Sequence, residues 1–522
     1  MPQQINLRIR ASEAQDEAAL RRAAAEALAL SESSISGVQR LRQSLDARGR
    51  QAWLQIKANV FVDEPFLPNP PLRPVLPDVG HALEKVIVVG AGPAGLFAAL
   101  RLIELGIKPI VLERGKDVRA RRRDLAALNK EGIVNPESNY CFGEGGAGTY
   151  SDGKLYTRST KRGDVQRILD LLVTYGADER IRYEAHPHIG TNKLPHIITA
   201  IREAIIAHGG EVLFEKKLTG FTLAKGRITR VQTADGDELP ADAVVLATGH
   251  SARDIFELLQ QKGLRIEFKP FALGVRIEHP QSLIDQGQYH CDIRPEWLPP
   301  AAYSLVQQVS GRGVFSFCMC PGGIIAPAAT APGEVVVNGW SPSKRNNPYA
   351  NSGIVVNVEE ADIQAFSKMG ALAGVGFQSE VEHKAFAAGG GKLVAPAQRL
   401  VDFTKGITSP TLPDCSYLPG IHSVDLRSVL PGFVHASLQQ AFKEFGRKIR
   451  GYYTNDAVVV ATESRTSSPV RIPRDGETLA HPQAANLYPC AEGAGYAGGI
   501  VSAAMDGERV AGEIARVLGK RF

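Results

Sequence analysis

A glycine-rich turn between a buried strand and a helix is the feature that most constrains this chain. The turn, Gly90-Ala91-Gly92-Pro93-Ala94-Gly95, follows the apolar run Val86–Val89 and precedes the helix-forming segment LFAALRLIE. In this GxGxxG pattern the first glycine allows a tight turn, the second lets a pyrophosphate approach the backbone, and the third lets the helix pack on the strand. Glu113 ends the next predicted strand 18 residues after Gly95, where a carboxylate that binds ribose is expected. The pattern predicts a Rossmann-type dinucleotide site, with the phosphates at the helix N-terminus.

Two later segments resemble the remaining fingerprints of the glutathione-reductase-like FAD superfamily. Ala241–Arg253, ADAVVLATGHSAR, resembles the second fingerprint, a strand that ends in Ala-Thr-Gly beside the cofactor. Leu487–Gly512 resembles the third, a strand followed by an acid and a glycine-rich entry to a helix. The resemblance implies that Glu492, where Asp is common, bonds the ribityl chain and that the helix N-terminus faces the pyrimidine end of the isoalloxazine. FAD, bound without a covalent link, is therefore the expected cofactor.

A second GxGxxG pattern, Gly493–Gly498, does not predict a second nucleotide domain. Only 24 residues follow Gly498, fewer than the ~30 of a strand–helix–strand unit. NAD(P)H is therefore expected only as a transient electron donor in the cleft beside the flavin.

More specifically, five segments resemble the poorly characterised bacterial FAD-dependent dehydrogenases that carry a small N-terminal domain. The resemblance implies a flavoprotein oxidoreductase that transfers a hydride through flavin N5, and it does not supply the substrate. The segments are Cys141–Arg158, Lys269–Gln281, Phe317–Ala329, Glu463–Asp475 and Glu492–Gly507.

Candidate cofactor contacts come from the three fingerprints, from segment 143–153 and from a predicted strand around 212–214. Five glycines in segment 143–153 allow the backbone to lie against a ligand. In the superfamily, a strand placed like 212–214 passes the adenine. The candidates are Gly90, Gly92, Pro93, Ala94, Gly95, Glu113, Arg114, Gly146, Gly148, Ser151, Val212, Ala247, Thr248, Gly249, Glu492, Gly498, Gly499 and Ile500.

The catalytic residues stay unassigned, and three of the candidates are a lysine and two thiols. Lys154 could steady negative charge on a reduced flavin. Cys318 and Cys320 form a CxC pattern, whose disulfide would close a small, strained and easily reduced ring. The alternative is that both thiols pack in a turn or line a substrate site.

Charged residues supply the other candidates. Glu463 and Arg465 could recognise a ligand, or they could form a structural ion pair, since buried charges are usually paired. The basic run Lys116–Arg123 could bind phosphate or an acidic substrate, or it could lie on a solvated helix face.

The expected fold is α/β, a Rossmann-type FAD-binding domain with an inserted domain and a small N-terminal domain. Residues 1–63 predict an α+β (ferredoxin-like) domain whose helix opens with the capping-box pair Ser12 and Gln15. Six prolines in residues 65–77 predict a linker at 64–84. Residues 85–270 and 481–522 are expected to form the FAD-binding domain. Between them, 271–480 is expected to be a mainly β (α+β) substrate domain with one clear helix around 438–449.

Composition and charge set the expected surroundings of the protein. Apolar residues make up 44% of the chain and charged residues 22%, which suits a globular protein with ample core. The net charge of +5 gives no reason to expect DNA, and no apolar stretch approaches the ~18 residues of a membrane span. Six scattered cysteines and histidines without ligand spacing predict neither a disulfide scaffold nor a metal site. We expect a cytoplasmic protein that meets a small-molecule substrate or electron donor, and we predict no oligomeric state.

Three other functions stay open. A flavin monooxygenase of the hydroxybenzoate-hydroxylase kind usually carries Asp-Gly at the second fingerprint, whereas this chain has Ala-Thr-Gly there and its Asp235-Gly236 lies before the strand. A flavin-containing RNA-modifying or RNA-binding protein is supported by the basic isoelectric point and the basic run. A flavin-dependent structural or sensor protein without turnover is the third.

Overall fold

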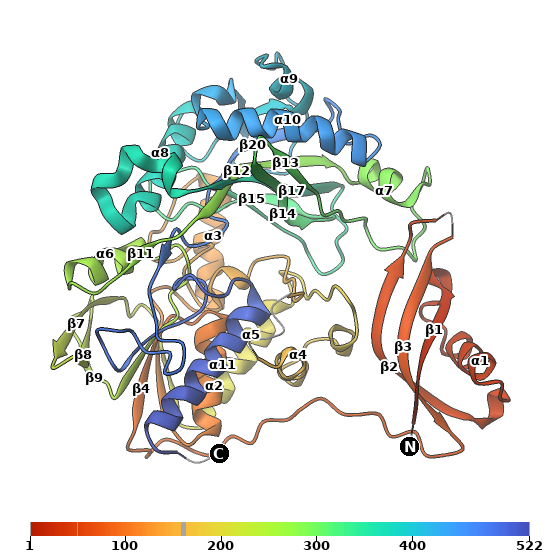
Figure 1. The fold of residues 1–522 in the computed structure, drawn as a ribbon, viewed down its shortest axis with the longest axis horizontal. Helices are drawn as coiled ribbons and strands as arrows, with labels where there is room; N and C mark the ends of the chain where they lie inside the picture. Colours follow the sequence, from red (N-terminus) through yellow and green to blue (C-terminus); the bar gives the residue numbers. More distant parts are fainter. Residues whose placement is uncertain (1, 50, 158–162, 521–522) are drawn as a thin grey trace.

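The computed structural model describes residues 2–49, 51–157 and 163–520, so Arg158, at the end of one of the family-like segments, lies outside the described residues. Three units are visible in Figure 1: a small N-terminal sheet, a central α/β unit, and a second large sheet above it. None of the helices in the described part of the chain is long and apolar enough to cross a membrane.

The N-terminal unit is an antiparallel sheet with one α-helix packed against it. Strands β1 (Gln3–Arg10), β2 (Ile35–Asp46) and β3 (Trp53–Val62) pair in the order β1-β3-β2. Helix α1 (Glu17–Leu28) begins after Asp16, whose side chain accepts a hydrogen bond from the Ala18 amide. A ferredoxin-like β-α-β-β-α-β pattern has a further helix and strand, which the described residues of this unit lack. The capping prediction was also wrong, because Ser12 lies in the 3-10 helix η1 (Ala11–Glu13).

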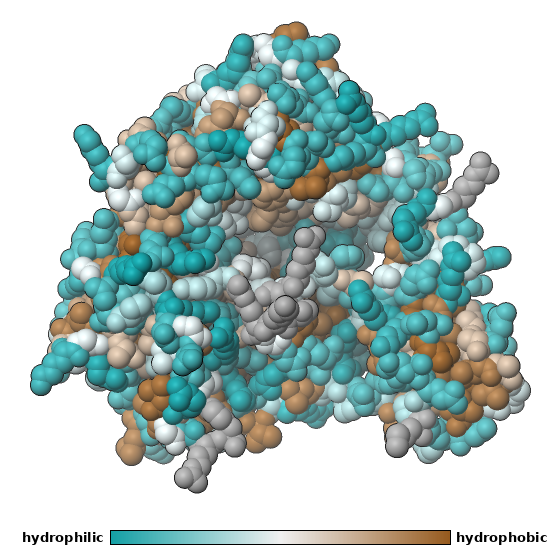
Figure 2. Space-filling model, viewed as in Figure 1, coloured by the Kyte–Doolittle hydropathy of each residue, from teal (hydrophilic) through white to brown (hydrophobic). Residues whose placement is uncertain are grey.

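Residues 64–84 contain no helix or strand. The segment runs along the central unit, where the Arg182 guanidinium donates hydrogen bonds to the Asn69 and Pro70 carbonyls. In Figure 1 it is the long extended stretch along the lower edge. Figure 2 shows hydrophilic side chains over most of the same face and hydrophobic ones gathered over the N-terminal unit at lower right.

The central unit is a five-stranded parallel sheet in the order β22-β10-β4-β5-β6. Its edge strand β22 comes from the far end of the chain, while the other four strands come from residues 85–246. The bounds are β4 (Lys85–Val89), β5 (Lys108–Leu112), β6 (Glu211–Leu213), β10 (Ala243–Leu246) and β22 (Leu487–Pro489).

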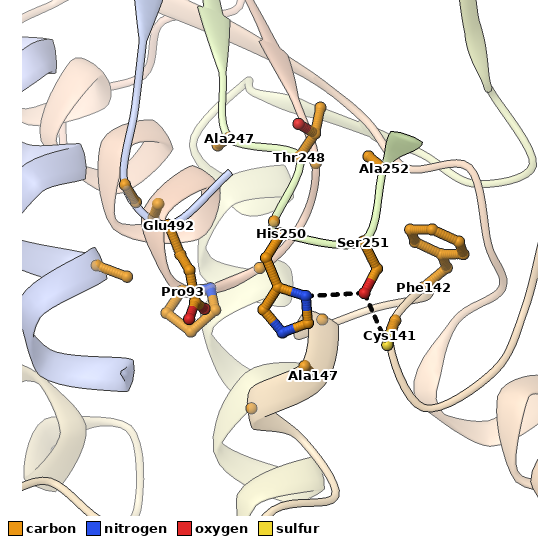
Figure 3. A pocket seen from close by; sticks show the side chains of 18 of the residues that line it. Pro93, Cys141, Phe142, Ala147, Ala247, Thr248, His250, Ser251, Ala252 and Glu492 are labelled. Carbon is orange, nitrogen blue, oxygen red and sulfur yellow. Dashed lines mark hydrogen bonds between the residues drawn. The ribbon is translucent and has the colours of Figure 1, made fainter. Parts of the chain in front are cut away.

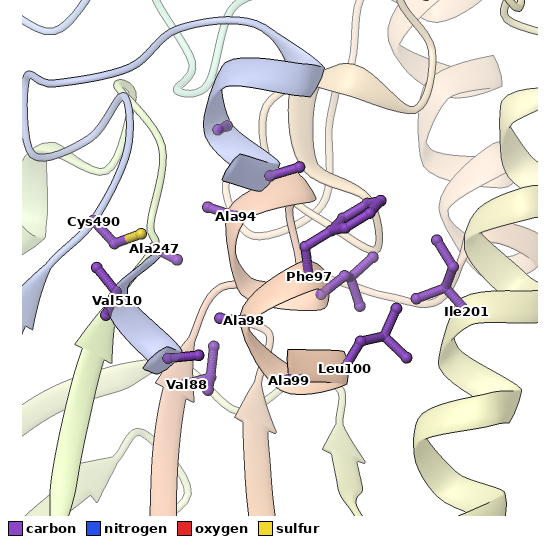
Figure 4. Close-up of a cluster of buried hydrophobic side chains, with 14 of the residues drawn as sticks. Val88, Ala94, Phe97, Ala98, Ala99, Leu100, Ile201, Ala247, Cys490 and Val510 are labelled. Carbon is purple, nitrogen blue, oxygen red and sulfur yellow. The ribbon is translucent and has the colours of Figure 1, made fainter. Parts of the chain in front are cut away.

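Alternate residues of these strands point into two different cores. Val86, Val88 and Val111 pack with helices α2, α4, α5 and α11, and Ile87, Val89 and Ile110 pack with helix α6 and a β-meander. Figure 4 shows α2 between the sheet, Ile201 of α5 and Val510 of α11. The bounds are α2 (Pro93–Glu104), α3 (Val118–Glu131), α4 (Val165–Thr174), α5 (Leu194–Ala207), α6 (Arg253–Gln261), α11 (Ile500–Val517), β7 (Leu218–Ala224), β8 (Arg227–Thr233) and β9 (Glu238–Pro240).

The second large unit is a seven-stranded sheet in the order β13-β14-β17-β12-β20-β18-β19. All of its neighbouring strands run antiparallel except β18 and β19. The bounds are β12 (Phe271–Pro280), β13 (Val306–Val309), β14 (Arg312–Cys320), β17 (Tyr349–Val358), β18 (Ala395–Arg399), β19 (Ile421–Ser423) and β20 (Val458–Glu463).

This region holds more helix than the sequence predicted. Only the helix near 438–449 was expected, and it is α10 (Gly432–Lys448). The other helices are α7 (Gln281–Tyr289), η6 (Glu360–Leu372), α8 (Ala373–Ala388), α9 (Leu400–Lys405) and the short η7 (Leu426–Ser428). Helix α8 was missed because its buried residues, such as Gly374, Gln378 and Glu382, do not form an apolar stripe. Two small pairs complete the unit: β11 (Glu267–Phe268) with β21 (Val470–Arg471), and β15 (Ile324–Pro327) with β16 (Val337–Trp340).

Strand β12 shows how the two faces of this sheet differ. Leu273, Val275 and Ile277 join the core that includes α8 and α10. Arg276 and Glu278, which alternate with them, are buried on the opposite face. The sheet therefore presents polar side chains on the face away from those helices.

Candidate functional site

A cavity with about 1370 Å³ of empty space, part of it open to solvent, lies where the central sheet meets the second unit. It is lined by all three glycine-rich segments that the sequence singled out. The predicted cofactor residues that line it are Gly90, Gly92, Pro93, Ala94, Glu113, Arg114, Gly146, Gly148, Ser151, Ala247, Thr248, Gly249, Glu492, Gly499 and Ile500.

Three predicted contacts lie elsewhere. Gly95 packs α2 on the turn, since a Cβ there would lie 1.9 Å from the Gly90 carbonyl oxygen. Val212 pairs with Val111 inside the sheet. Gly498 lies against the Glu492 side chain, 3.1 Å from Oε1 to a Cβ built on the glycine. None of the three is among the cavity-lining residues.

The Glu113 carboxylate is fixed by backbone amides at the end of β5. Its Oε2 accepts a hydrogen bond from Ala91, and its Oε1 accepts from Gly115 and Gly143, each at 2.9 Å. A carboxylate has about four acceptor positions, so one remains for a ligand hydroxyl. Glu113 thus joins the first glycine turn to the glycine-rich loop, a structural role that the sequence did not suggest.

Two helices begin at the cavity wall. Gly92 and Pro93 open α2, and Gly499 and Ile500 open α11. The helices pack so closely that a Cβ on Gly507 would lie 2.1 Å from the Ala94 carbonyl oxygen. The free amides and positive dipole ends of both helices are therefore directed to one space, which favours an anionic ligand there.

Arg121 of the basic run is a structural residue. It is fully buried, and its guanidinium donates hydrogen bonds of 2.8–3.0 Å to the carbonyls of Asn139, Tyr140, Glu144 and Gly146. Burial lowers the pKa of this guanidinium. It shapes the loop that carries Gly146 and Gly148 to the cavity.

The cavity fits a flavin dinucleotide. No protein atom lies within 4 Å of a Cβ built on Gly92, Gly249 or Gly499, so at these positions the backbone faces open space. The Thr248 hydroxyl is buried without a hydrogen-bond partner among the described residues. Burial raises the pKa of the nearby Glu492 carboxyl to about 7 against the opposing effect of Lys269. Open backbone, a spare hydroxyl and a carboxyl able to hold a proton together suit phosphates, ribityl hydroxyls and a flavin ring.

A side chamber with about 610 Å³ of empty space, part of it open to solvent, adjoins the large cavity. We define it by its walls: the loop around Tyr140 and Tyr150, the β15–β16 pair, and the end of β20. The two spaces share five lining residues, Cys141, Ala147, Ser151, His250 and Cys318.

Three of the polar residues at this junction were missed by the sequence analysis. The Ser251 hydroxyl lies 2.8 Å from His250 Nδ1 and donates to Cys141 Sγ at 3.4 Å (Figure 3). When the hydroxyl proton is directed to sulfur, the matching imidazole tautomer carries its proton on Nδ1 and leaves Nε2 as an acceptor. Burial, with Arg465 and Arg253 nearby, lowers the pKa of His250 to about 4. The sequence signal that could have identified His250 is its position directly after the Ala-Thr-Gly fingerprint.

The two thiols of the CxC pattern lie in different surroundings. Cys318 lines both cavities, whereas Cys320 is fully buried and lines neither. The ladder between β14 and β17 slips between Phe317 and Cys320, and Cys318 takes a φ of +46°. A hydrogen bond from Cys320, helped by Lys154 and Arg276, lowers the pKa of the Cys318 thiol well below its usual range.

The remaining catalytic candidates also lie near the junction. Lys154 lines the large cavity, and its ammonium donates to the Met319 carbonyl. Glu463 and Arg465 line the side chamber, but they do not pair with each other. Arg276 binds Glu463 at 2.7 Å, and Arg465 binds Glu334 and Glu382.

Comparison with known proteins places these cavities in a family. Residues 84–126 match the model described as "FAD binding domain", 190–329 match "FAD dependent oxidoreductase", and 270–466 match "FAD-dependent protein, C-terminal domain-like". Residues 1–61 match a domain of unknown function. An uncharacterised protein of Clostridium beijerinckii is 40% identical over 505 residues, which cover 93% of this chain and 94% of that protein. The chain belongs to this poorly characterised family of FAD-dependent proteins.

Other proteins that are similar to this chain are more distant relatives. A thiamine thiazole synthase of Aeropyrum pernix is 29% identical over 187 residues, 33% of this chain and 57% of that protein. Among solved structures, 2,6-dihydroxypyridine-3-hydroxylase from Arthrobacter nicotinovorans is 11% identical, with a TM-score of 0.37 and 84% of each chain covered.

Proposed function

We propose that this protein is a dehydrogenase or reductase that passes a hydride between FAD in the large cavity and a small molecule in the side chamber. The observation that carries the proposal is the junction, where five residues line both spaces. A molecule in the side chamber would meet the large cavity there, and the matched FAD-dependent oxidoreductase domain supports this chemistry. When bound, FAD supplies a ring nitrogen, N5, that accepts or releases the hydride.

The chain's own residues have distinct parts in this proposal. Gly92 and the α2 N-terminus bind the pyrophosphate, Glu113 binds the ribose through its remaining acceptor position, and the α11 N-terminus faces the flavin ring. His250 Nε2 accepts a hydrogen bond at the junction, since burial keeps the imidazole neutral and Nδ1 is held by Ser251. Lys154 stabilises negative charge on the large-cavity side.

Anaerobic mixing with NADH, and separately with NADPH, tests the proposal through the flavin absorbance. Rapid bleaching would support a reductase with a nicotinamide donor in the cleft. A flavin that stays oxidised with both, and is then bleached by a chamber-sized substrate, would support a dehydrogenase. Protein that neither retains FAD on purification nor binds it on reconstitution would overturn the proposal.

Repeating the mixing in air tests for oxygen chemistry. Substrate-dependent oxygen uptake that yields a hydroxylated product would replace the dehydrogenase or reductase by a monooxygenase. Hydrogen peroxide as the sole oxygen product would leave the proposed hydride transfer in place.

A further inference from the structure

Aromatic and aliphatic side chains form most of the side chamber. Tyr140 and Tyr150 pack edge to face, with ring centroids 6.5 Å apart, and Trp340 lies at the end of β16. Ala326, Pro327, Ala328, Val336 and Val337 line the chamber beside them. Rings of this kind prefer edge-to-face or offset contact with another ring, so the walls favour a flat aromatic guest.

The first charged group in the chamber wall, Arg465, is already neutralised. Its guanidinium donates to both Glu382 oxygens at 3.0 and 2.9 Å, to Glu334 at 2.7 Å and to Thr330 at 2.6 Å. These bonds use four of the five N–H groups of an arginine. Arg253 lies beside the same two carboxylates, so two cations face two anions.

The second charged pair, Arg276 with Glu463, is neutral as well. Both side chains are buried and join at 2.7 Å. Gly339 makes room for this pair, since a Cβ there would lie 2.0 Å from Arg276 Nη1. The Cys318 thiolate, which also lines the chamber, is offset by the Lys154 ammonium. Cations and anions around the wall therefore balance, and a charged guest would lose its hydration without gaining a partner.

Two side chains of the wall, Glu463 and Arg465, each have one polar group left to bond a guest. The Arg276 bond uses Glu463 Oε2, and Oε1 has no hydrogen-bond partner among the described residues. A carboxylate oxygen accepts hydrogen bonds, so it can bind an N–H or O–H of the guest. The remaining N–H of Arg465 can donate to a carbonyl.

We infer that the side chamber binds an uncharged, planar aromatic molecule that carries a hydrogen-bond donor, held between the aromatic walls and the free oxygen of Glu463. The inference rests on the proposed function, which makes this chamber the substrate site. It adds a substrate class, defined by charge, planarity and a polar substituent.

Four probes of matched shape test this class on the full-length holoprotein. Benzamide is neutral and aromatic, benzoate and benzamidinium are its anionic and cationic isosteres, and cyclohexanecarboxamide keeps the amide without the ring. Calorimetric titration at pH 8 measures each Kd with Glu463 ionised, because burial raises the pKa of its carboxyl to about 7. We expect benzamide to bind at least tenfold more tightly than either charged isostere and at least fivefold more tightly than cyclohexanecarboxamide.

Tryptophan fluorescence locates the binding. The chain has three tryptophans, Trp53, Trp297 and Trp340, of which Trp340 lines the chamber. Benzamide should change the emission of the native protein and not that of Trp340→Phe. Trp340→Leu, which keeps an apolar wall, should bind benzamide at least fivefold more weakly.

Glu463→Gln tests the charge balance, because it leaves Arg276 without its carboxylate. The ratio of benzoate to benzamide affinity should rise at least tenfold, while FAD content and circular dichroism report whether the variant folds. If Glu463→Gln does not fold, the probe affinities of the native protein and the benzamide affinity of Trp340→Leu still test the inference.

Several results would overturn the inference. These are a charged isostere that binds the native protein as tightly as benzamide, equal affinity for the cyclohexane compound, or no binding of any probe at millimolar concentration. Failure of the proposed function would give a different result. If the protein binds benzamide selectively but its flavin is never reduced, the class of ligand stands and the proposed oxidoreductase activity is wrong.

Discussion

At the scale of single residues, Gly92 and Gly95 lie in the same turn, yet a methyl group should act differently at each. A Cβ on Gly92 meets no protein atom within 4 Å, whereas one on Gly95 would lie 1.9 Å from the Gly90 carbonyl oxygen. The first glycine keeps space for a ligand, and the second keeps space for the protein itself. The structure supports the packing role that the motif spacing predicts for Gly95, while contact of Gly92 with a pyrophosphate stays a prediction.

We expect Gly92→Ala to fold as stably as the native apoprotein and to lose at least tenfold in FAD affinity. Gly95→Ala should instead lower the free energy of unfolding by ~1–3 kcal/mol, the usual cost of overpacking. Chemical denaturation of the apoproteins and flavin fluorescence titration separate the two effects. Full FAD affinity in Gly92→Ala would remove the turn from the cofactor site.

Cys318 is the other residue with a distinct chemical prediction. Its thiol should react with iodoacetamide at pH 7 faster than any of the other five cysteines, because the thiolate is the nucleophile and this pKa is lowered. Lys154→Met should slow the reaction at least threefold, whereas Lys216→Met, at another part of the same cavity wall, should not. Peptide mass spectrometry over a pH series measures both. A reaction midpoint near pH 8.5, as in a free cysteine, would contradict the assignment.

At the scale of elements, the glycine-rich loop depends on one arginine. Arg121 reaches from α3 to four carbonyls between Asn139 and Gly146. Other bonds to this segment each hold a single point: the Gly143 amide donates to Glu113, the Gly145 amide donates to the Ala91 carbonyl, and the Glu144 carboxylate accepts from the Val118 amide. The Arg121 guanidinium instead joins four carbonyls at once. The loop should therefore order or loosen as a unit with this guanidinium.

We expect Arg121→Met to leave the fold in place, to speed amide exchange in residues 139–148, and to weaken FAD binding at least tenfold. Arg123→Met, at an exposed position of the same helix, is the matched control and should match the native protein. Hydrogen-exchange mass spectrometry reports the loop directly. Unchanged exchange in Arg121→Met would show that the loop is held by other contacts.

Elements were predictable where the chain carries a local signal. The strand, turn and helix from Val86 to Glu104 follow from apolar periodicity and the glycine spacing, and α10 follows from its buried stripe. The role of Arg121 was not predictable, because its carbonyl partners are 18 to 25 residues away and have no sequence signature. The same holds for the start of α1, where Asp16 rather than Ser12 caps the helix.

At the scale of the whole molecule, a buried charge cluster joins the two large units. Arg253 begins α6 of the central unit, and it meets Glu334 and Glu382 of the second unit, which also bind Arg465. These residues are spread over more than 200 positions of the chain, so only the fold brings them together. The sequence suggested instead that Glu463 pairs with Arg465, and that alternative was wrong.

Glu382→Gln should lower the free energy of unfolding by ~3–5 kcal/mol at pH 7, because it leaves two buried guanidinium groups with one carboxylate. Burial alone would raise the pKa of the Glu382 carboxyl, but Arg253 and Arg465 outweigh it and lower that pKa to about 2 from an ordinary 4.5. The folded state therefore binds this proton less readily than the unfolded state, and the stabilisation is lost as pH falls from 4.5 towards 2. Denaturation curves of both proteins should converge over that range, and a gap that stays constant would contradict the prediction.

The position of β22 and α11 also bears on how a cell makes this protein. Both elements complete the central sheet and the cavity wall, yet they are translated about 240 residues after β10, their neighbour in the sheet. Domains generally fold from the N-terminus during synthesis, so the ribosome releases the two closing elements only after the whole second unit has emerged. A nascent chain that stalls before residue 487 lacks one wall of the flavin cavity. Binding of FAD would then distinguish full-length chains from arrested ones. Because a bound cofactor stabilises the folded state, a cell short of riboflavin would accumulate full-length chains that proteases degrade more readily.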